Sequence, residues 1–179
     1  MTEISPSGTL SGSPKMDALK EKQSSGLFRL LLALPVPWVF VIGYLVGAGL
    51  EVLFLPRNAG PGSHLVGMGG IALFVVGALI AGWAWTIFHG KGTTRVPGEA
   101  STALVMTGPY TVTRNPMYVG LTLAYIGEAG IQKQILPLAT LLFVLAYVNW
   151  IVIPIEEERL REVFGPAYDA YRLKVRRWL

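Results

Sequence analysis

Long apolar runs separated by short polar segments are the main feature of this chain. Three runs contain no Asp, Glu, Lys or Arg over at least about 20 residues, the length that a helix needs to cross a hydrocarbon core of roughly 30 Å. They cover residues 30–50, 65–88 and 135–155. A fourth run, residues 117–131, is shorter and contains Glu128, yet it is long enough to cross most of the bilayer. We therefore predict an all-α integral membrane protein with four transmembrane helices.

The basic residues indicate how these helices are oriented. Cytoplasmic segments of membrane proteins collect Lys and Arg. Thirteen of the 15 lie in the N-terminal arm, in the loop after the second run and in the C-terminal tail: Lys15, Lys20, Lys22, Arg29, Lys91, Arg95, Arg114, Arg159, Arg161, Arg172, Lys174, Arg176 and Arg177. Only Arg57 and Lys133 lie elsewhere. Four spans put all three basic segments on one side, so we expect a multi-pass cell-membrane protein whose termini and active site are cytoplasmic.

Composition supports a membrane protein and argues against several functions. Hydrophobic residues make up 52% of the chain, charged residues 15%, and the mean hydropathy is +0.50, unlike a soluble domain. The net charge of +4 is explained by the basic cytoplasmic segments and by contact with membrane lipids, so no nucleic-acid partner is expected. Cysteine is absent, which excludes disulfides and a cysteine nucleophile. His64 and His89 have no second ligand at metal-binding spacing, so no metal site is expected.

The chain divides into three regions. Residues 1–28 are rich in Ser, Gly, Pro and Lys and contain no apolar core, so we predict a disordered cytoplasmic arm without a signal peptide. Residues 29–88 contain the first two transmembrane helices. Residues 89–179 hold the polar segments that carry chemistry, namely a loop, a helical hairpin and the tail.

Glycines recur on the first two predicted helices. Gly43 and Gly47 form a GxxxG pair, which lets two membrane helices approach closely. The pair favours contact within the bundle, where Gly70 and Gly77 offer a complementary small face. The alternative is a homodimer through Gly43 and Gly47. The segment GMGG, residues 67–70, is assigned to helix packing because it lies inside a predicted span with no strand before it.

The polar segment TGPYTVTRNPMYVG, residues 107–120, precedes the third apolar run. Proline is favoured as the first residue of a helix, and asparagine is a preferred N-cap. We predict a helix that begins at Pro116 and is capped by the side chain of Asn115. Such a helix start, with Arg114 beside it, attracts an anionic group that Tyr118 can also face. The alternative is an interfacial anchor in which Arg114 and Tyr118 only contact lipid headgroups.

Three carboxylates, Glu156, Glu157 and Glu158, follow the last apolar run. Glu156 comes seven residues after Asn149, so on a continuing helix it shares a face with this intramembrane amide, and such polar groups often mark functional sites. Glu158 lies about 100° further round the helix and is expected to face outward. Apolar residues then recur at intervals of three and four: Leu160, Val163, Phe164, Tyr168, Tyr171 and Val175. This spacing predicts a cytoplasmic amphipathic helix along the headgroups, broken near residues 165–166.

Two segments, GPYTVTRNPMYVG and EEERLREVFGPAYDAYRLKVRRWL, closely resemble the isoprenylcysteine carboxyl methyltransferase family and its bacterial relatives, which are akin to the phospholipid methyltransferases. The resemblance covers about residues 88–179, half of the chain. It implies an integral-membrane enzyme that transfers a methyl group from S-adenosyl-L-methionine. The implied cofactor-binding residues are Gly108, Pro109, Tyr110, Arg114, Asn115, Pro116 and Tyr118 on one wall and Glu156 and Glu157 on the other. Arg114, Asn115 and Glu156 are the candidate catalytic residues.

The charges of this cofactor suit these residues. Arg114 and the helix start can bind its carboxylate, while Glu156 or Glu157 can bind its cationic and hydroxyl groups. Tyr110 or Tyr118 can stack on the adenine or lie near the sulfonium.

Two departures from the family leave the methyl acceptor open. The isoprenylcysteine enzymes commonly have histidine where this chain has Asn115, and the eukaryotic enzymes have more spans. The acceptor is therefore a prenylated or other lipid that enters from the bilayer, or a small hydrophobic thiol. A thiol or amine acceptor needs a general base, for which His89 or a glutamate is the local candidate.

Two other classes of protein remain as alternatives. One is a sterol-type membrane reductase that uses a nicotinamide cofactor, although the two glutamates after the last helix favour the methyltransferase. The other is a non-catalytic four-helix membrane protein.

Overall fold

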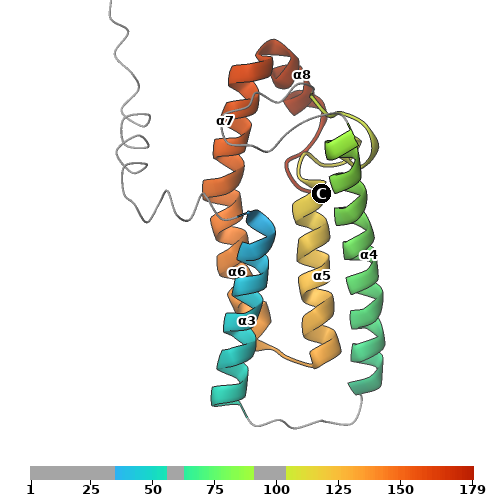
Figure 1. The fold of residues 1–179 in the computed structure, drawn as a ribbon, viewed down its shortest axis with the longest axis vertical. Helices are drawn as coiled ribbons and strands as arrows, with labels where there is room; N and C mark the ends of the chain where they lie inside the picture. The colour runs from blue at the N-terminus through green and yellow to red at the C-terminus, as the bar shows by residue number, and fades with distance from the viewer. Residues whose placement is uncertain (1–34, 56–62, 91–103) are drawn as a thin grey trace, which may run out of the picture. The chain divides into compact units, whose positions relative to one another are not determined.

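The computed structural model describes residues 35–55, 63–90 and 104–179, and within these ranges it is helical apart from turns and one isolated β-bridge (Figure 1). Its elements are α3 (Val36–Phe54), α4 (Ser63–Gly90), the 3-10 turn η1 (Gly108–Thr111), α5 (Pro116–Gln132), α6 (Leu136–Tyr147), the π-helical turn η2 (Val148–Val152), α7 (Ile153–Phe164) and α8 (Pro166–Lys174). The predicted arm, residues 1–28, lies outside the described residues.

Among the described residues, three helices are long and apolar enough to cross a membrane. They are Val36–Phe54, His64–Phe88 and Leu136–Phe164, of which the last joins α6, η2 and α7 into one continuous helix. Helix α5 has 17 residues. Its length of about 25 Å is less than the roughly 30 Å of a hydrocarbon core. The case for α5 as a fourth span therefore depends on its position beside α4.

Helices α4 and α5 lie side by side and run in opposite directions (Figure 1). A Cβ added at Gly70 would lie 2.7 Å from the carbonyl oxygen of Gly127, and one at Gly77 would lie 2.5 Å from that of Gly120. The two glycines of each helix are seven residues apart, so two small-residue contacts form in register and bring the backbones together. The prediction that Gly70 and Gly77 face the first helix was wrong, because α5 carries matching glycines of its own.

Helix α3 packs Gly43 and Gly47 against α6. A Cβ at Gly47 would lie 2.6 Å from the Cα atom of Pro137, and one at Gly43 would meet the side chain of Val144. Contact within the bundle was the favoured interpretation of this pair, but the partner is α6 and not α4. A homodimer through Gly43 and Gly47 would have to compete with this packing.

The end of α3 contacts the start of α6. The first apolar run ends at Leu50, but α3 continues to Phe54 and includes Glu51. The Glu51 carboxylate accepts hydrogen bonds from the backbone N–H groups of Ile135, at 2.8 Å, and Leu136, at 2.7 Å. These donors have no partner within their own helix, so a carboxylate at this position stabilises the start of α6.

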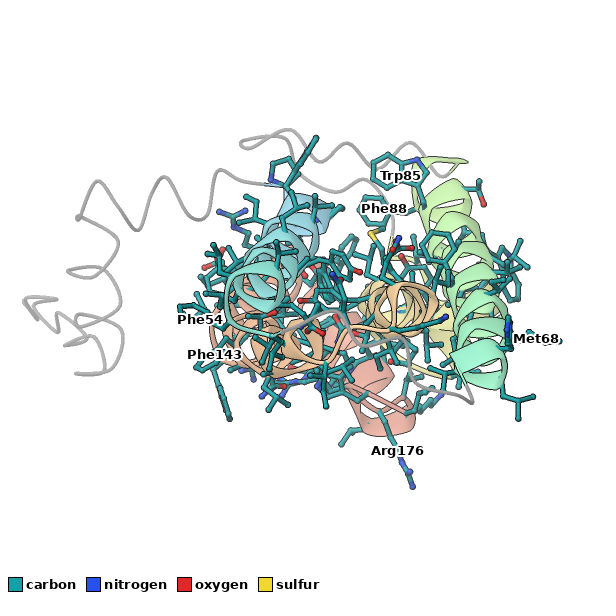
Figure 2. All side chains as sticks on the ribbon, turned by 90° about the horizontal axis from the view of Figure 1, so that it is seen from below. Phe54, Met68, Trp85, Phe88, Phe143 and Arg176 are labelled. Carbon is teal, nitrogen blue, oxygen red and sulfur yellow. The ribbon has the colours of Figure 1, made fainter. Side chains whose placement is uncertain are left out.

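Aromatic and aliphatic side chains fill the space between α3, α5 and α6, where Phe40 and Tyr125 meet edge to face with ring centroids 6.4 Å apart. Many large apolar side chains instead point away from the bundle. Figure 2 shows Phe54, Met68 and Phe143 on its outside, and their exposed fractions are 73%, 67% and 76%. Apolar groups exposed to this extent fit a protein surrounded by lipid.

Candidate functional site

Helix α5 begins at Pro116, as predicted, but the side chain of Asn115 does not cap it. The Asn115 amide nitrogen Nδ2 instead donates a hydrogen bond of 2.9 Å to the carbonyl oxygen of Arg177. The carbonyl of Asn115 accepts the N–H of Val119 at 3.1 Å and so makes the first bond of the helix. Asn115 thus occupies the predicted N-cap position, but the predicted side-chain cap was wrong, because the tail supplies another acceptor for the amide.

Residues 113–115 bind the end of the tail through its backbone. The hydroxyl of Thr113 donates to the carbonyl of Arg177 at 3.0 Å, and the N–H of Arg114 donates to the carbonyl of Arg176 at 2.9 Å. Thr113 and Arg176 also form an isolated parallel β-bridge. The end of the tail therefore returns to the start of α5, a contact that the sequence analysis did not predict.

Glu157 on α7 lies between two arginines. Its exposed fraction is 9%. Nη2 of Arg177 lies 2.6 Å from Oε2, and Nε of Arg177 lies 3.2 Å from Oε1, which is a bidentate pair. Nη1 of Arg114 lies 3.1 Å from Oε1 of the same carboxylate. One carboxylate between two guanidinium groups leaves this ion cluster with a net charge of one positive unit.

Arg114 is buried but only partly satisfied. Its side chain is 11% exposed, and among the described residues neither Nε nor Nη1 has a well-aligned hydrogen-bond acceptor. The contact between Nη1 and Glu157 is an ion pair by distance only. Buried polar groups are nearly always hydrogen-bonded, so each exception needs an explanation. An anionic ligand would supply the missing acceptors.

Glu156 and Tyr118 form a second polar contact. The Tyr118 hydroxyl donates toward both oxygens of the Glu156 carboxylate, at 2.8 and 2.9 Å. Glu158 is exposed, as predicted. The argument that related Glu156 to Asn149 does not hold, because Asn149 lies in the π-helical turn η2, where the ordinary helical period is interrupted.

The turn η1, which precedes α5 in the chain, contacts both α4 and α8. Gly108 has a φ of 62°, and a Cβ there would lie 2.5 Å from Cδ1 of Ile87 on α4. The hydroxyl of Tyr110 donates to the carbonyl of Ala84 at 3.4 Å, and the carbonyl of Tyr110 accepts the hydroxyl of Tyr171 at 2.7 Å. These contacts hold the loop between two helices. Direct contact of the turn with a cofactor stays a prediction.

The tail helix breaks at Gly165, as predicted, where φ is 49°. Tyr168 and Tyr171 on α8 are buried, but Val163, which was expected on the same apolar face, is 47% exposed. The break changes the helix direction, so one face cannot continue through both α7 and α8.

Both buried tyrosines of α8 stay protonated at ordinary pH. Burial raises the pKa of Tyr171 to about 12, and the neighbouring Tyr168 adds to this effect. Burial also raises the pKa of Tyr168, with a further contribution from the charge of Glu157 that Arg114 opposes. The two phenols therefore act as neutral packing and hydrogen-bonding groups.

An apolar groove with a volume of about 640 Å³ begins close to the ion cluster. It is lined by Val119, Thr122 and Leu123 of α5, by Leu142, Leu145, Ala146, Asn149 and Trp150 of α6 and η2, and by Trp178 and Leu179 of the tail. The indole N–H of Trp178 donates to Oδ1 of Asn149 at 2.9 Å. Trp178 follows Arg177 in the chain, so one peptide unit connects the groove wall to the ion cluster.

The structure brings some of the predicted site residues together and leaves others in supporting positions. Arg114, Asn115 and Glu157 meet around the tail, and Tyr118 meets Glu156. The remaining predicted residues, Gly108, Pro109, Tyr110 and Pro116, form the turn η1 and the start of α5. The side chain of His89 lies outside the described residues.

Sequence reasoning missed Arg177 and Trp178. The segment RRWL was interpreted only as part of a basic tail at the headgroups. Nothing in its composition distinguishes an arginine that binds a buried carboxylate from one that binds lipid. The one available signal was the tryptophan, whose indole N–H usually finds a partner when buried.

Comparison with known proteins identifies the family. A family model described as phospholipid methyltransferase matches residues 65–167, more than half of the chain. The nickel-cobalt-cadmium resistance protein NccN of Alcaligenes xylosoxydans xylosoxydans is 32% identical over 106 residues, which are 59% of this chain and 44% of that protein. This chain thus matches less than half the length of that relative, and no solved structure matches. The family match agrees with the resemblance found in the sequence, and the chain belongs to the phospholipid methyltransferase family.

Proposed function

We propose that this protein is an integral-membrane methyltransferase that uses S-adenosyl-L-methionine and acts on a lipophilic or small hydrophobic acceptor, as the isoprenylcysteine carboxyl O-methyltransferases do. The observation that carries the proposal is the buried guanidinium of Arg114, whose Nε and Nη1 donors lack aligned acceptors in the part of the chain that the structure describes. Family membership supports methyl transfer in general. The cofactor, the acceptor and the residue roles are the proposed part.

The residues at the start of α5 fit the cofactor. When bound, S-adenosyl-L-methionine supplies an activated methyl group to a nucleophilic acceptor. Arg114 would hold its carboxylate through a charge-assisted hydrogen bond from Nε, which has no aligned acceptor among the described residues. Glu156, which accepts hydrogen bonds from the Tyr118 hydroxyl, would hold a cationic or hydroxyl group of the cofactor. Glu157 already has two arginine partners, so we assign it no direct contact with the cofactor.

The apolar groove would hold the hydrocarbon part of the acceptor. Its lining is almost entirely apolar, it lies on helices whose outer faces are exposed apolar surface, and its wall at Trp178 is next to the ion cluster. The main task of the protein residues is then to align the acceptor with the methyl group and to exclude water. An ionised carboxylate acceptor needs no base, whereas a thiol or amine needs one.

The active site would face the cytoplasm of a cell membrane. The described basic residues on α7, α8 and the tail belong to the same end of the bundle as Arg114. Such residues prefer the cytoplasmic side. Both termini would then be cytoplasmic, and α5 would be the fourth span.

Calorimetric titration of S-adenosylhomocysteine into the purified protein tests the proposal. We expect binding by the unchanged protein. Arg114→Ala should weaken the affinity at least about ten-fold, because a hydrogen bond to a charged group contributes roughly 1.5 to 3 kcal/mol. Glu156→Gln should also weaken it, while the matched control Glu158→Gln, at an exposed position on the same helix, should not.

Other results would favour the alternatives. Thermal stabilisation by NADPH in place of S-adenosylhomocysteine would indicate a reductase. A response to neither ligand would indicate a non-catalytic membrane protein. If S-adenosylhomocysteine binds, incubation of lipid and small-molecule extracts with methyl-labelled cofactor identifies the acceptor.

A further inference from the structure

Arg177 has no role in the function proposed above, yet it makes the closest contacts to Glu157. Its Nη2 and Nε atoms engage both carboxylate oxygens, at 2.6 and 3.2 Å. Arg114 reaches the same carboxylate only through Nη1, without a well-aligned hydrogen bond. Glu157 therefore has its main partner, Arg177, in the tail, and Arg114, which precedes α5, is the weaker of the two partners.

The tail backbone fixes Arg177 independently of its guanidinium. The Arg177 carbonyl accepts hydrogen bonds from Thr113 and from Asn115, and the preceding carbonyl accepts the N–H of Arg114. The Trp178 indole adds a further anchor. The Arg177 guanidinium is thus placed beside Glu157 by a tail segment whose backbone and neighbouring Trp178 are hydrogen-bonded at several points.

The charges of the cluster show what Arg177 contributes. Without Arg177, the buried Glu157 would have Arg114 as its remaining cationic partner among the described residues. An unpaired buried charge is costly, so the carboxylate would draw the Arg114 guanidinium into a full ion pair. The cluster would then be neutral, and its donors would be used within the protein.

We propose that Arg177 is a positioning residue that neutralises Glu157 and so keeps Arg114 available for the anionic group of the ligand. This inference rests on the proposed function, in which that group is the carboxylate of the cofactor. It gives Arg177 and Arg114 separate tasks, although both contact the same carboxylate. The family match ends at residue 167, so this task falls to a residue outside the matched range.

The test compares a single and a double variant by calorimetric binding of S-adenosylhomocysteine. Arg177→Ala should weaken the affinity at least about ten-fold, which corresponds to about 1.4 kcal/mol. In the variant that combines Arg177→Ala with Glu157→Gln, Arg114 is the remaining charged member of the ion cluster. The net charge of the cluster is then one positive unit, as in the unchanged protein. The affinity of this double variant should return to within about two-fold of the unchanged protein if removal of the carboxylate compensates for removal of Arg177. Arg177→Lys should keep most of the affinity, because the charge remains.

Arg176→Ala is the matched control. It removes the same charge from the neighbouring residue, whose exposed side chain extends away from the bundle in Figure 2, and it should leave the affinity unchanged. A role limited to tail docking predicts that the double variant binds as weakly as Arg177→Ala, and that result would overturn the inference. Equal loss in Arg176→Ala would also overturn it. Equal binding by the unchanged protein and Arg177→Ala would refute this inference alone. Absence of binding by the unchanged protein would refute the proposed function, and with it the inference.

Discussion

At the scale of single residues, Tyr171 links the tail helix to the loop before α5. Its hydroxyl donates to the carbonyl of Tyr110 at 2.7 Å, and burial raises its pKa to about 12. The ordinary pKa of tyrosine is about 10, so the folded protein holds this proton more tightly than the unfolded chain does. The resulting stabilisation is complete below about pH 10 and decreases as the pH rises from about 10 to about 12.

Replacement of Tyr171 by Phe should separate the hydrogen bond from the titration. At neutral pH the variant should lose about 1 kcal/mol, the typical net contribution of a hydrogen bond. Above about pH 10 its stability should fall less steeply than that of the unchanged protein, since one group with a raised pKa is gone. Circular dichroism during thermal unfolding in detergent, at a series of pH values, measures both effects. Parallel alkaline losses in the two proteins would contradict the role of this phenol.

Asn115 shows why a residue's type is easier to predict than its partner. Asparagine before proline indicates a helix start, and α5 does begin at Pro116. The amide nevertheless binds the carbonyl of Arg177, which is 62 residues away in the chain. A local pattern contains no information about a contact at that separation. The same limit explains why Arg177 was counted with the lipid-facing basic residues.

At the scale of elements, contact between α4 and α5 depends on glycines that face backbone atoms. A Cβ at Gly70 would lie 2.6 Å from the backbone nitrogen of Ile131, while a Cβ at Gly69 would meet no atom of the described residues within 4 Å. Backbone atoms cannot move aside as the end of a flexible side chain can. A larger side chain should therefore be tolerated at Gly69 but not at Gly70.

Gly70→Ala should destabilise the protein by about 1 to 3 kcal/mol, the usual cost of overpacking. Gly69→Ala is the matched control and should be neutral or slightly stabilising, because alanine favours a helix by up to about 1 kcal/mol. Unfolding of both variants in a denaturant series provides the comparison. A loss of similar size in both would mean that the cost arises from something other than the α4–α5 contact.

Helix boundaries could be predicted where a local signal exists. The run at residues 117–131 became α5 (Pro116–Gln132), because Pro116 marks its start and the left-handed Lys133, with φ 56°, ends it. The first run was ended at Leu50, before the end of α3, because the runs were defined as free of charged residues and Glu51 follows. Its carboxylate is used by two N–H groups at the start of α6, a contact that only the folded bundle reveals.

At the scale of the whole described bundle, the tail connects parts that are distant in sequence. Thr113 to Asn115 bind its backbone, Glu157 binds Arg177, and Asn149 binds Trp178. The sequence predicted that the start of α5 and the carboxylates of α7 meet. It did not predict the segment between them, since RRWL contains no turn or periodic signal. The start of α5 and the carboxylates of α7 were predicted to meet because both lie at the same boundary of the predicted spans. The return of the tail to this place depends on the break in the helix at Gly165.

The direction of α5 determines the topology of the whole protein. Its start lies beside the tail, and its far end lies beside the early part of α4, where a Cβ at Gly130 would contact the Cα of Gly70 at 3.1 Å. If α4 crosses the membrane, α5 therefore returns through the same layer, although it is shorter than a typical span. The start of α6 and the end of α7 must then lie on opposite sides.

Labelling of introduced cysteines measures whether the start of α6 and the end of α7 lie on opposite sides of the membrane, because the chain itself contains no cysteine. Gln132→Cys, at the exposed end of α5, should react with a membrane-impermeant maleimide in intact cells. Leu173→Cys, on the tail helix at a residue that is 89% exposed, should react only after the membrane is opened. This result requires an odd number of crossings between the two positions and a cytoplasmic tail, as the positive-inside distribution predicts. Reaction of both cysteines in intact cells would refute the four-span arrangement and the cytoplasmic location of the proposed active site.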